Sequence, residues 1–319
     1  MLSLECLAPV SITVYDRLDH ITKTIEALSE NYLAKETVLN IFSDAATLGD
    51  EEKIKKVRDY LKTINNFKET IIVEQKINNY EKNIKDAYTT PLNTFDKFIR
   101  MEDDIVTSPY FLTYMNNALK VYKDNKDVFV ISGYVPNIDF DIKDKDIFLS
   151  KDFSAWGYAT WSNRDFIYAR ERMDYYSQIK KQKNLAKAMS DLHPKIMFLL
   201  KNIEKGYANQ GDFKLFANIW LNNMYTIKPK YSLVKNIGFD GKGKGKNVTN
   251  IFDTTLRSDF NPKLDLNLKY KDMYDKMIFR KYFDLSKYEL LKLKLKLKII
   301  SFLKDYKLEW IKEWLKKYI

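Results

Sequence analysis

The sequence has 319 residues, 45% of them hydrophobic, which is enough for one large domain or two smaller ones with a packed core and excludes a mostly disordered chain. Its single cysteine, Cys6, excludes an internal disulfide and fits a reducing cytoplasm. Two histidines disfavour a histidine-rich zinc site or a histidine-based triad, and the net charge of +11 indicates an anionic partner.

The first half of the chain alternates short apolar, β-prone runs with longer stretches of helical periodicity. The opening run is interpreted as a strand and not a signal peptide, because residues 1–17 lack a basic leader and a long apolar core. Strands are predicted at residues 10–15, 38–43, 70–74, 97–101 and 128–132, with helices at 20–31 and 50–64. This alternation is typical of a mainly parallel, doubly wound sheet whose strand ends lie along one edge.

From residue 150 onward the pattern is less regular and richer in aromatic residues, beginning with FSAWGYATW. Helices are predicted at residues 164–179, 194–205 and 210–223, and a strand at 231–237. The run GKGKGK that follows has the composition of a mobile loop. We expect this half of the chain to form a substrate-binding lobe.

Residues 98–106, FIRMEDDIV, join an apolar run typical of a buried strand to three consecutive carboxylates, Glu102, Asp103 and Asp104. Adjacent carboxylates repel one another unless a cation or ribose hydroxyls compensate, and oxygen-rich clusters suit Mg²⁺ or Mn²⁺. In open α/β sheets, ligands bind where strands end. The alternative is a solvated acidic turn before a helix that begins near Pro109. This stretch alone leaves both interpretations open.

Polar side chains also follow the first two predicted strands: Tyr15, Asp16 and Arg17 after the first, and Asp44 after the second. Arg17 is suited to meet a phosphate and Asp44 to accept a hydrogen bond from a base or sugar. The alternatives are a surface charge for Arg17 and a turn former for Asp44. Together with the acid triplet, these residues resemble a nucleotide pocket.

Several motifs resemble, in their order along the chain, the GT-A glycosyltransferases of the family 2 type over about residues 8–250. They are ITVYDRLDHITKTIEAL for the first strand and helix, IFSD for the second strand end, MEDD for the DXD-type metal motif, WGYATW and GFDGKGKGKN. The EDD form also resembles the acid triplet of the eukaryotic N-acetylglucosaminyltransferases that begin glycan branching. The resemblance implies a GT-A fold, which is a Rossmann-like α/β fold with a mainly parallel sheet flanked by helices.

The resemblance also implies roles for individual residues. Asp104 would coordinate a divalent metal, Mn²⁺ or Mg²⁺, on the donor diphosphate, and Asp103 would bond the donor ribose, with Glu102 in support. Asp44 and the backbone near Tyr15 would hold the nucleobase, with Arg17 near the diphosphate. A bound cation stabilises the negative charge that develops on a leaving nucleoside diphosphate.

An inverting transfer also needs a base that takes the proton of the acceptor hydroxyl. Asp212, in NQGDFKLF, resembles the later catalytic acid of this group in its order along the chain. The alternative role for Asp212 is a helix cap, and Asp240 in GFDG is a second candidate for the base.

The WGYATW segment is expected to form part of the wall for donor sugar and acceptor. Gly157 permits close approach of the backbone and Trp156 offers a stacking face, although core packing of the two tryptophans is the alternative. Residues 238–246 superficially match a Walker A spacing, but Gly245 stands where Ser or Thr should bind magnesium. A flexible lid is therefore favoured over an ATP site.

The C-terminal residues 286–319 carry ten lysines against four acidic residues, a net charge of +6. The stretch LKLKLKLKII alternates with the period of a strand, but its Leu and Lys content and the amphipathic residues after it favour a helix. A basic amphipathic helix with tryptophans is typical of an anionic membrane interface. The alternative is packing on the domain or on a second subunit. Nucleic acid is not an expected partner, because no recognised binding module accompanies the charge.

Taken together, the sequence predicts a metal-dependent inverting glycosyltransferase, hexosyl or N-acetylhexosaminyl, that moves a sugar from a UDP-sugar to a glycan or lipid-linked acceptor in cell-surface polysaccharide synthesis. Residues 1–250 are the expected catalytic domain, with a nucleotide-sugar half (1–135) and an acceptor half (136–250). Residues 251–285 connect it to the C-terminal helix, which places the chain in the cytoplasm on the inner face of the membrane. A sugar-phosphate nucleotidyltransferase and a non-enzymatic membrane or polyanion-binding module are the alternatives.

Overall fold

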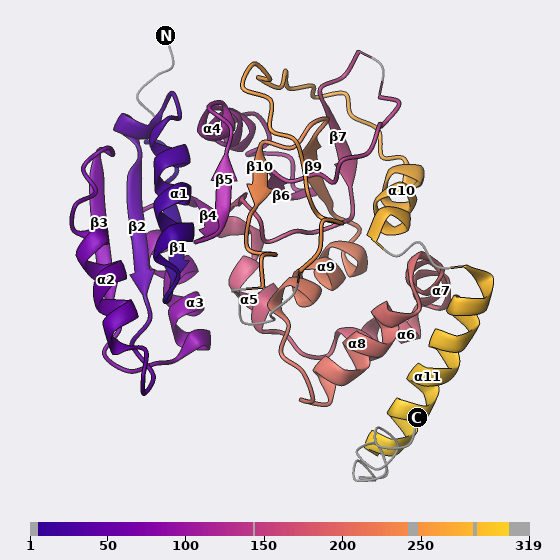
Figure 1. The fold of residues 1–319 in the computed structure, drawn as a ribbon. Coiled ribbons are helices and arrows are strands. Elements are labelled where there is room, and N and C mark those ends of the chain that lie inside the picture. Colours follow the sequence, from indigo (N-terminus) through magenta and orange to yellow (C-terminus); the bar gives the residue numbers. More distant parts are fainter. Residues whose placement is uncertain (1–5, 143, 242–247, 283–285, 306–319) are drawn as a thin grey trace.

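The computed structural model describes residues 6–142, 144–241, 248–282 and 286–305, which form a mixed α/β fold around an eight-stranded sheet (Figure 1). The order of its strands is β3-β2-β1-β4-β8-β6-β9-β7. Their bounds are β1 (Val10–Val14), β2 (Val38–Ser43), β3 (Glu69–Glu74), β4 (Lys97–Glu102), β6 (Val128–Ser132), β7 (Ile147–Ser150), β8 (Tyr158–Trp161) and β9 (Tyr225–Pro229). Strands β5 (Ile105–Thr107) and β10 (Val234–Asn236) form a second, antiparallel pair.

The main sheet is largely parallel. Strands β3, β2, β1 and β4 run parallel to one another, and β6 and β9 form another parallel pair. Strand β8 lies antiparallel between β4 and β6, so β6 and β9 point the same way as the first four strands, while β7 is antiparallel to β9. The predicted α/β class with a mainly parallel sheet is confirmed.

All five strands predicted in the first half are present, each within one residue of its predicted ends. They are recognisable because β1, β2, β4 and β6 are almost wholly buried, so their sequences are rich in apolar and β-branched residues with few polar ones between them. Strands β7, β8 and β9 were not predicted as strands. At four or five residues each, they are too short to show a period in the sequence.

Helices cover the sheet and build the second half. In the first half they are α1 (Leu18–Ser29), α2 (Glu51–Leu61), α3 (Tyr80–Thr89) and α4 (Phe111–Val121), with short 3₁₀ turns at Ala34–Glu36 and Pro91–Asn93. In the second half they are α5 (Phe166–Glu171), α6 (Tyr175–Lys181), α7 (Lys183–Leu192), α8 (Lys195–Glu204), α9 (Gly211–Leu221), α10 (Asp272–Tyr282) and α11 (Lys287–Asp305), with a 3₁₀ turn at Ser162–Arg164. The predicted apolar face of α1 is buried through Ile21, Ile25 and Leu28.

Two predicted elements differ from the structure. The single helix predicted over residues 164–179 is divided into α5 and α6, because the backbone of Arg172 is extended (ψ 141°) and ends α5 at Glu171. Asp165, which has a left-handed backbone (φ 51°), precedes α5 and delays its start to Phe166. The strand predicted over residues 231–237 is limited to the three residues of β10, which pairs with β5 and not with the main sheet.

Helix α10 lies within the expected connecting segment, residues 251–285, and packs on the sheet domain. Its Tyr274 and Ile278 are buried in a small core. Its Asp275 accepts hydrogen bonds from Ser150 Oγ at 2.5 Å and from the backbone N–H of Lys151 at 3.0 Å. This helix therefore closes the end of β7.

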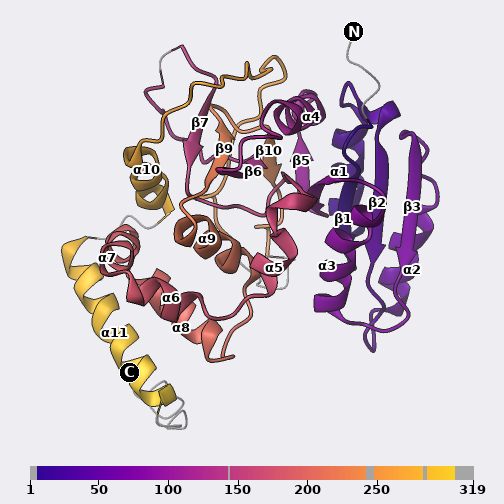
Figure 2. The same cartoon turned by 180° about the vertical axis from the view of Figure 1, so that it is seen from behind.

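The stretch LKLKLKLKII is helical, within α11, and the two opposite views show α11 extending away from the sheet domain (Figures 1 and 2). Helix α11 contacts α8. Tyr288, Leu291, Leu295 and Ile299 are exposed along it. The predicted tryptophans Trp310 and Trp314 lie outside the described residues. Within the ranges that the structure describes, no helix combines the length and the apolar content needed to span a bilayer.

Candidate active site

The carboxyl ends of the central parallel strands bring the predicted polar residues together at one edge of the sheet. Strand β1 pairs with β2 so that Val14 lies beside Ser43, and with β4 so that Thr13 lies beside Glu102. The residues that follow these positions are Tyr15 to Arg17, Asp44 and the acid triplet. Register alone therefore assembles the cluster that the sequence predicted from strand ends.

The acid triplet occupies the turn between β4 and β5, and this turn is buried. Asp103 and Asp104 are only 6% and 7% exposed, so the alternative of a solvated acidic turn is wrong. Arg17 Nη2 contacts Asp103 Oδ1 and donates to Asp104 Oδ2 at 2.9 Å. Thr24 Oγ1 donates to the carbonyl oxygen of Asp103 at 2.8 Å, which fixes the turn against α1.

Negative charge is concentrated in this turn. Burial raises the pKa of Asp103 to about 6, although Arg17 acts in the opposite direction. Burial, followed by the neighbouring carboxylates Asp104 and Asp212, raises the pKa of Glu102 to about 8. Burial acts to lower the pKa of Arg17, but the two aspartates outweigh it and the net change is upward. Arg17 thus faces Asp103 and Asp104, while Arg100 opposes the rise in the pKa of Glu102. Three carboxyl groups share two arginines, so a further cation would be stabilised here.

One oxygen of the triplet is suited to hold a metal ion. Asp104 Oδ1 is buried and has no hydrogen-bond partner within the described structure. Among the described residues, no three His, Cys, Asp or Glu side chains lie together in a group that could hold a metal ion without a further ligand. Mg²⁺ is commonly held by one or two carboxylates together with substrate phosphates, so a single aspartate oxygen fits this mode of binding.

The triplet opens into a cavity of about 680 Å³ that Arg17, Tyr15 and Asp44 also line. Tyr15 Oη donates to Asp50 Oδ2 at 3.1 Å and is 2.9 Å from Thr47 Oγ1. Asp44 Oδ1 accepts from the backbone N–H of Ala45 at 2.9 Å and of Asn79 at 3.0 Å. Both residues therefore also order the loops of the cavity that they line.

A second cavity, of about 1060 Å³, adjoins the first, and Asp212 lines it. Asp212 lies in the first turn of α9 with its side chain 54% exposed, and its Oδ1 is 3.5 Å from Arg170 Nη1. Asp240, the other candidate base, has its Oδ2 3.4 Å from His20 Nε2. The structure thus places Asp212 on the larger cavity and Asp240 beside α1.

The two cavities share a wall that includes Glu102, Trp156, Phe239 and Tyr80. The Trp156 ring packs edge-on against Tyr134 and Phe239, with ring centroids 4.7 and 5.5 Å apart. Gly157 has φ +69°, and a Cβ there would lie 2.9 Å from Val234 Cγ1, so the segment needs glycine at this point. Trp156 therefore belongs to the cavity wall and is also packed, which combines the two interpretations of WGYATW.

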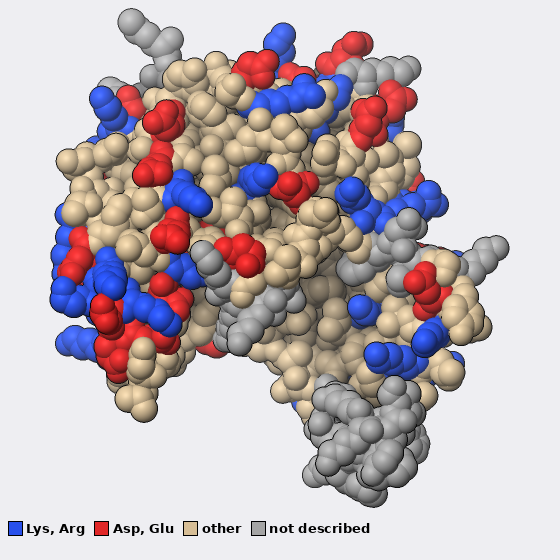
Figure 3. All heavy atoms as spheres, viewed as in Figure 1, with Lys and Arg blue, Asp and Glu red and all other residues tan. Residues whose placement is uncertain are grey.

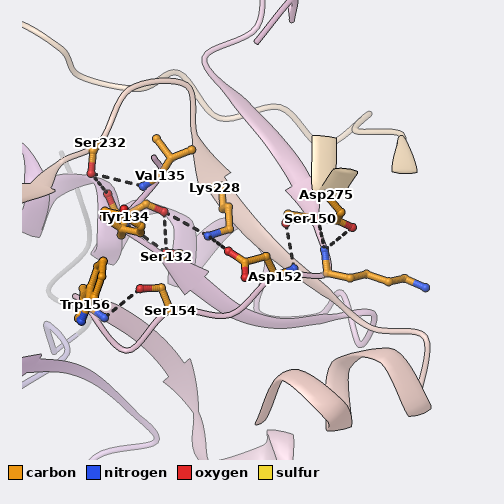
Figure 4. Close-up of polar contacts among 12 residues, drawn as sticks. Ser132, Tyr134, Val135, Ser150, Asp152, Ser154, Trp156, Lys228, Ser232 and Asp275 are labelled. Carbon is orange, nitrogen blue, oxygen red and sulfur yellow. Dashed lines mark hydrogen bonds and ion pairs between the residues drawn. The ribbon is translucent and has the colours of Figure 1, made fainter. Parts of the chain in front are cut away.

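A buried ion pair contacts the start of the same loop (Figure 4). Lys228 on β9 is fully buried, and its Nζ lies 3.0 Å from Asp152 Oδ2 and donates to the carbonyl oxygen of Tyr134 at 3.2 Å. Asp152 lines the larger cavity, four residues before Trp156. Buried charges are costly unless paired, so this pair fixes the position of the loop.

Sequence reasoning missed four residues of these walls: Tyr80, Asp152, Arg170 and Lys214. Tyr80 begins α3, whose helical pattern was not recognised, and the other three are single charged residues without a motif. The predicted glycine-lysine lid lies largely outside the described residues, which end at Gly241 and resume at Val248.

No protein-family model matches the sequence, and a search of curated proteins found no significant match. Among solved structures, the chain is similar to the mannosyltransferase PcManGT from Pyrobaculum calidifontis in complex with GDP-Man and Mn²⁺, with a TM-score of 0.39, 14% identity and coverage of 69% of this chain and 70% of that one. It is also similar to residues 1–349 of S. aureus TarS, with a TM-score of 0.43, 12% identity and coverage of 92% and 76%. These likenesses concern the course of the chain alone.

Proposed function

We propose that this chain is a metal-dependent, inverting GT-A glycosyltransferase, hexosyl or N-acetylhexosaminyl. It would transfer a sugar from a nucleotide-sugar, a UDP-sugar in our proposal, to a glycan or lipid-linked acceptor. The observation that carries the proposal is the pair of adjoining cavities, one containing the buried acid triplet with Arg17 and the other containing Asp212. A two-substrate transfer needs such an arrangement, because donor and acceptor must meet at a shared wall.

In the smaller cavity, each residue has a role that matches its position. Asp103 accepts hydrogen bonds from the donor ribose, and Arg17, already beside both aspartates, neutralises part of the charge of the diphosphate. Asp44 and the backbone at Tyr15 hold the nucleobase. Glu102 supports the turn from the wall between the cavities.

The proposed metal is Mn²⁺ or Mg²⁺, held by Asp104 through its unpartnered Oδ1. When bound, such an ion supplies electrostatic stabilisation of the leaving diphosphate. The protein contributes a carboxylate that burial and the Ile237 N–H keep in place, since this N–H donates to the carbonyl oxygen of Asp104 at 2.9 Å.

Asp212 is the proposed base, because it lines the larger cavity where an acceptor would bind. We expect Asp212→Asn to reduce sugar transfer by about 10²–10⁴-fold while leaving donor binding unchanged. Asp240→Asn is the matched control and should retain transfer. If Asp212→Asn transfers at the wild-type rate, the base is another acid.

The general proposal is tested by measuring hydrolysis of a panel of nucleotide-sugars, with Mn²⁺ and with a chelator. We expect turnover of at least one donor that depends on the metal. Absence of both metal-dependent turnover and nucleotide binding across the panel would refute the proposal.

Association with an anionic membrane surface is the proposed role of residues 286–319. The support is the exposed apolar series along α11, which alternates with lysines in the sequence. On the face shown in Figure 3, acidic and basic side chains are interspersed over the described surface. The net charge of +6 in residues 286–319 is the proposed source of the attraction. A cytoplasmic location on the inner face of the membrane follows from this proposal.

A further inference from the structure

Two cations on the wall of the larger cavity have no role in the transfer proposed above. Lys214 lies in the first turn of α9 and is only 4% exposed. Arg170, on α5, lines the same cavity, and its side chain is 15% exposed. These residues come from different helices, so the fold brings their charges together.

Lys214 has no carboxylate partner in the described structure. No Asp or Glu oxygen of the described residues lies within 4.0 Å of its Nζ, whereas most buried lysines are paired. Glu81 and Glu171 attract it only from a greater distance, and Glu171 is already paired with Lys85 at 2.5 Å. Burial, and then the charge of Arg170, lower the pKa of Lys214, which reflects the cost of this position.

The start of α9 adds to the positive potential. Its N-cap residue, Gln210, makes no capping hydrogen bond through its side chain, and Gln210 and Gly211 line the larger cavity, so the first turn of the helix borders this region. The N-terminus of a helix carries a partial positive charge, where a lysine is unfavourable. Asp212 supplies one negative charge, 3.5 Å from Arg170, and the second cation is left uncompensated.

We propose that Lys214, Arg170 and the N-terminus of α9 form a binding site for a phosphoryl group of the acceptor. A phosphate group would be held by the buried charge of Lys214 and by the guanidinium of Arg170, which it would share with Asp212, and its oxygens would accept from N–H groups of the first turn of the helix. The assignment of this phosphoryl group to the acceptor rests on the proposed function, in which the donor diphosphate binds in the other cavity. It narrows the acceptor class to phosphate-bearing glycans or lipid-linked sugars.

The test is titration calorimetry with inorganic phosphate on the full-length protein, with acetate as the comparison ion. We expect Lys214→Met to weaken phosphate binding at least tenfold and Lys214→Arg to retain it within about threefold. Lys85→Met is the matched control, since Lys85 lines the same cavity but already has a carboxylate partner, and it should bind like the wild type. If Lys214→Met does not fold, Arg170→Met tests the same site from α5.

Phosphate binding that is absent from the wild type, or unchanged by Lys214→Met, would overturn the inference. Acetate binding as tightly as phosphate would also overturn the assignment to a phosphoryl group. UDP binding in the presence of Mn²⁺ is measured in the same variants. If the wild type does not bind UDP, the proposed function is contradicted and the phosphate site is not. If the wild type binds UDP but not phosphate, only the phosphate site is contradicted.

Discussion

The buried pair between Lys228 and Asp152 gives the sharpest prediction for stability. Lys228→Met replaces the amine with an apolar side chain of similar length. Asp152 then remains buried without its cation, which is 3.0 Å away in the native structure, and the Tyr134 carbonyl oxygen loses a donor at 3.2 Å. Solvent compensates little, because the Asp152 side chain is only 9% exposed and Lys228 is fully buried.

Removal of one partner of a buried ion pair costs about 3–5 kcal/mol. We therefore expect Lys228→Met to lower the free energy of unfolding by this amount, and Asp152→Asn to lower it by a similar amount. The double variant removes both charges, so its cost should fall short of the sum of the single costs by about 2–3 kcal/mol. Lys187→Met is the control, because the pair with Asp191 at 2.6 Å is exposed and is expected to contribute only about 0–1 kcal/mol.

The assay is urea unfolding followed by circular dichroism, with the slope on denaturant concentration compared among the variants to confirm that the same transition is measured. The reasoning is refuted if Lys228→Met costs no more than Lys187→Met. Single costs that simply add in the double variant would show that the two groups do not interact.

Three further changes test other parts of the structure. In Gly238→Ala the new Cβ would lie 2.0 Å from Asp104 Oδ2, so we expect Mn²⁺-dependent UDP binding to weaken by about 10–100-fold in calorimetry, and unchanged affinity would contradict the placement of Asp104. Burial raises the pKa of Asp275 from 3.8 to about 6, so the folded state holds the proton of this carboxyl group more tightly than the unfolded state does. The protonated group therefore stabilises the fold fully below about pH 4, and this contribution is lost as the pH rises through 6. The wild type should therefore lose about 3 kcal/mol more than Asp275→Ala between pH 4 and 7 in urea unfolding, and parallel curves would exclude the effect. The wild type should co-sediment with anionic but not with neutral vesicles, and deletion of residues 286–319 should abolish this binding. Binding that persists in the deletion variant would assign the membrane contact to another part of the protein.

Four of the five predicted strands in the first half could be predicted because they are mostly buried, whereas the partly exposed edge strand β3 is marked by its β-branched residues. Strand β2, for example, has five buried residues in succession, three of them apolar (Leu39, Ile41 and Phe42), so it is visible as a strand without knowledge of its neighbours. The polar residues after such runs then identify the edge where the acid triplet, Arg17 and Asp44 meet. The metal, the base and the tail are still predictions.

The second half could not be read in the same way. Strand β8 has four residues, and its place between β4 and β6 depends on pairing with segments about 30 and 60 residues earlier in the chain. The break between α5 and α6 lies at Arg172, whose extended backbone (ψ 141°) ends α5, and the sequence has no glycine or proline there to mark it.

What the sequence determined by itself is therefore local: apolar runs, their polar ends and the carboxylates of FIRMEDDIV. Only the tertiary structure decided which of these carboxylates are buried. It alone placed Lys214 and Arg170 on the wall of one cavity and paired Lys228 with Asp152. The physical reason is that a charged residue in a sequence indicates a solvated surface by default. Burial and pairing are properties of contacts between distant segments, and no local pattern encodes them.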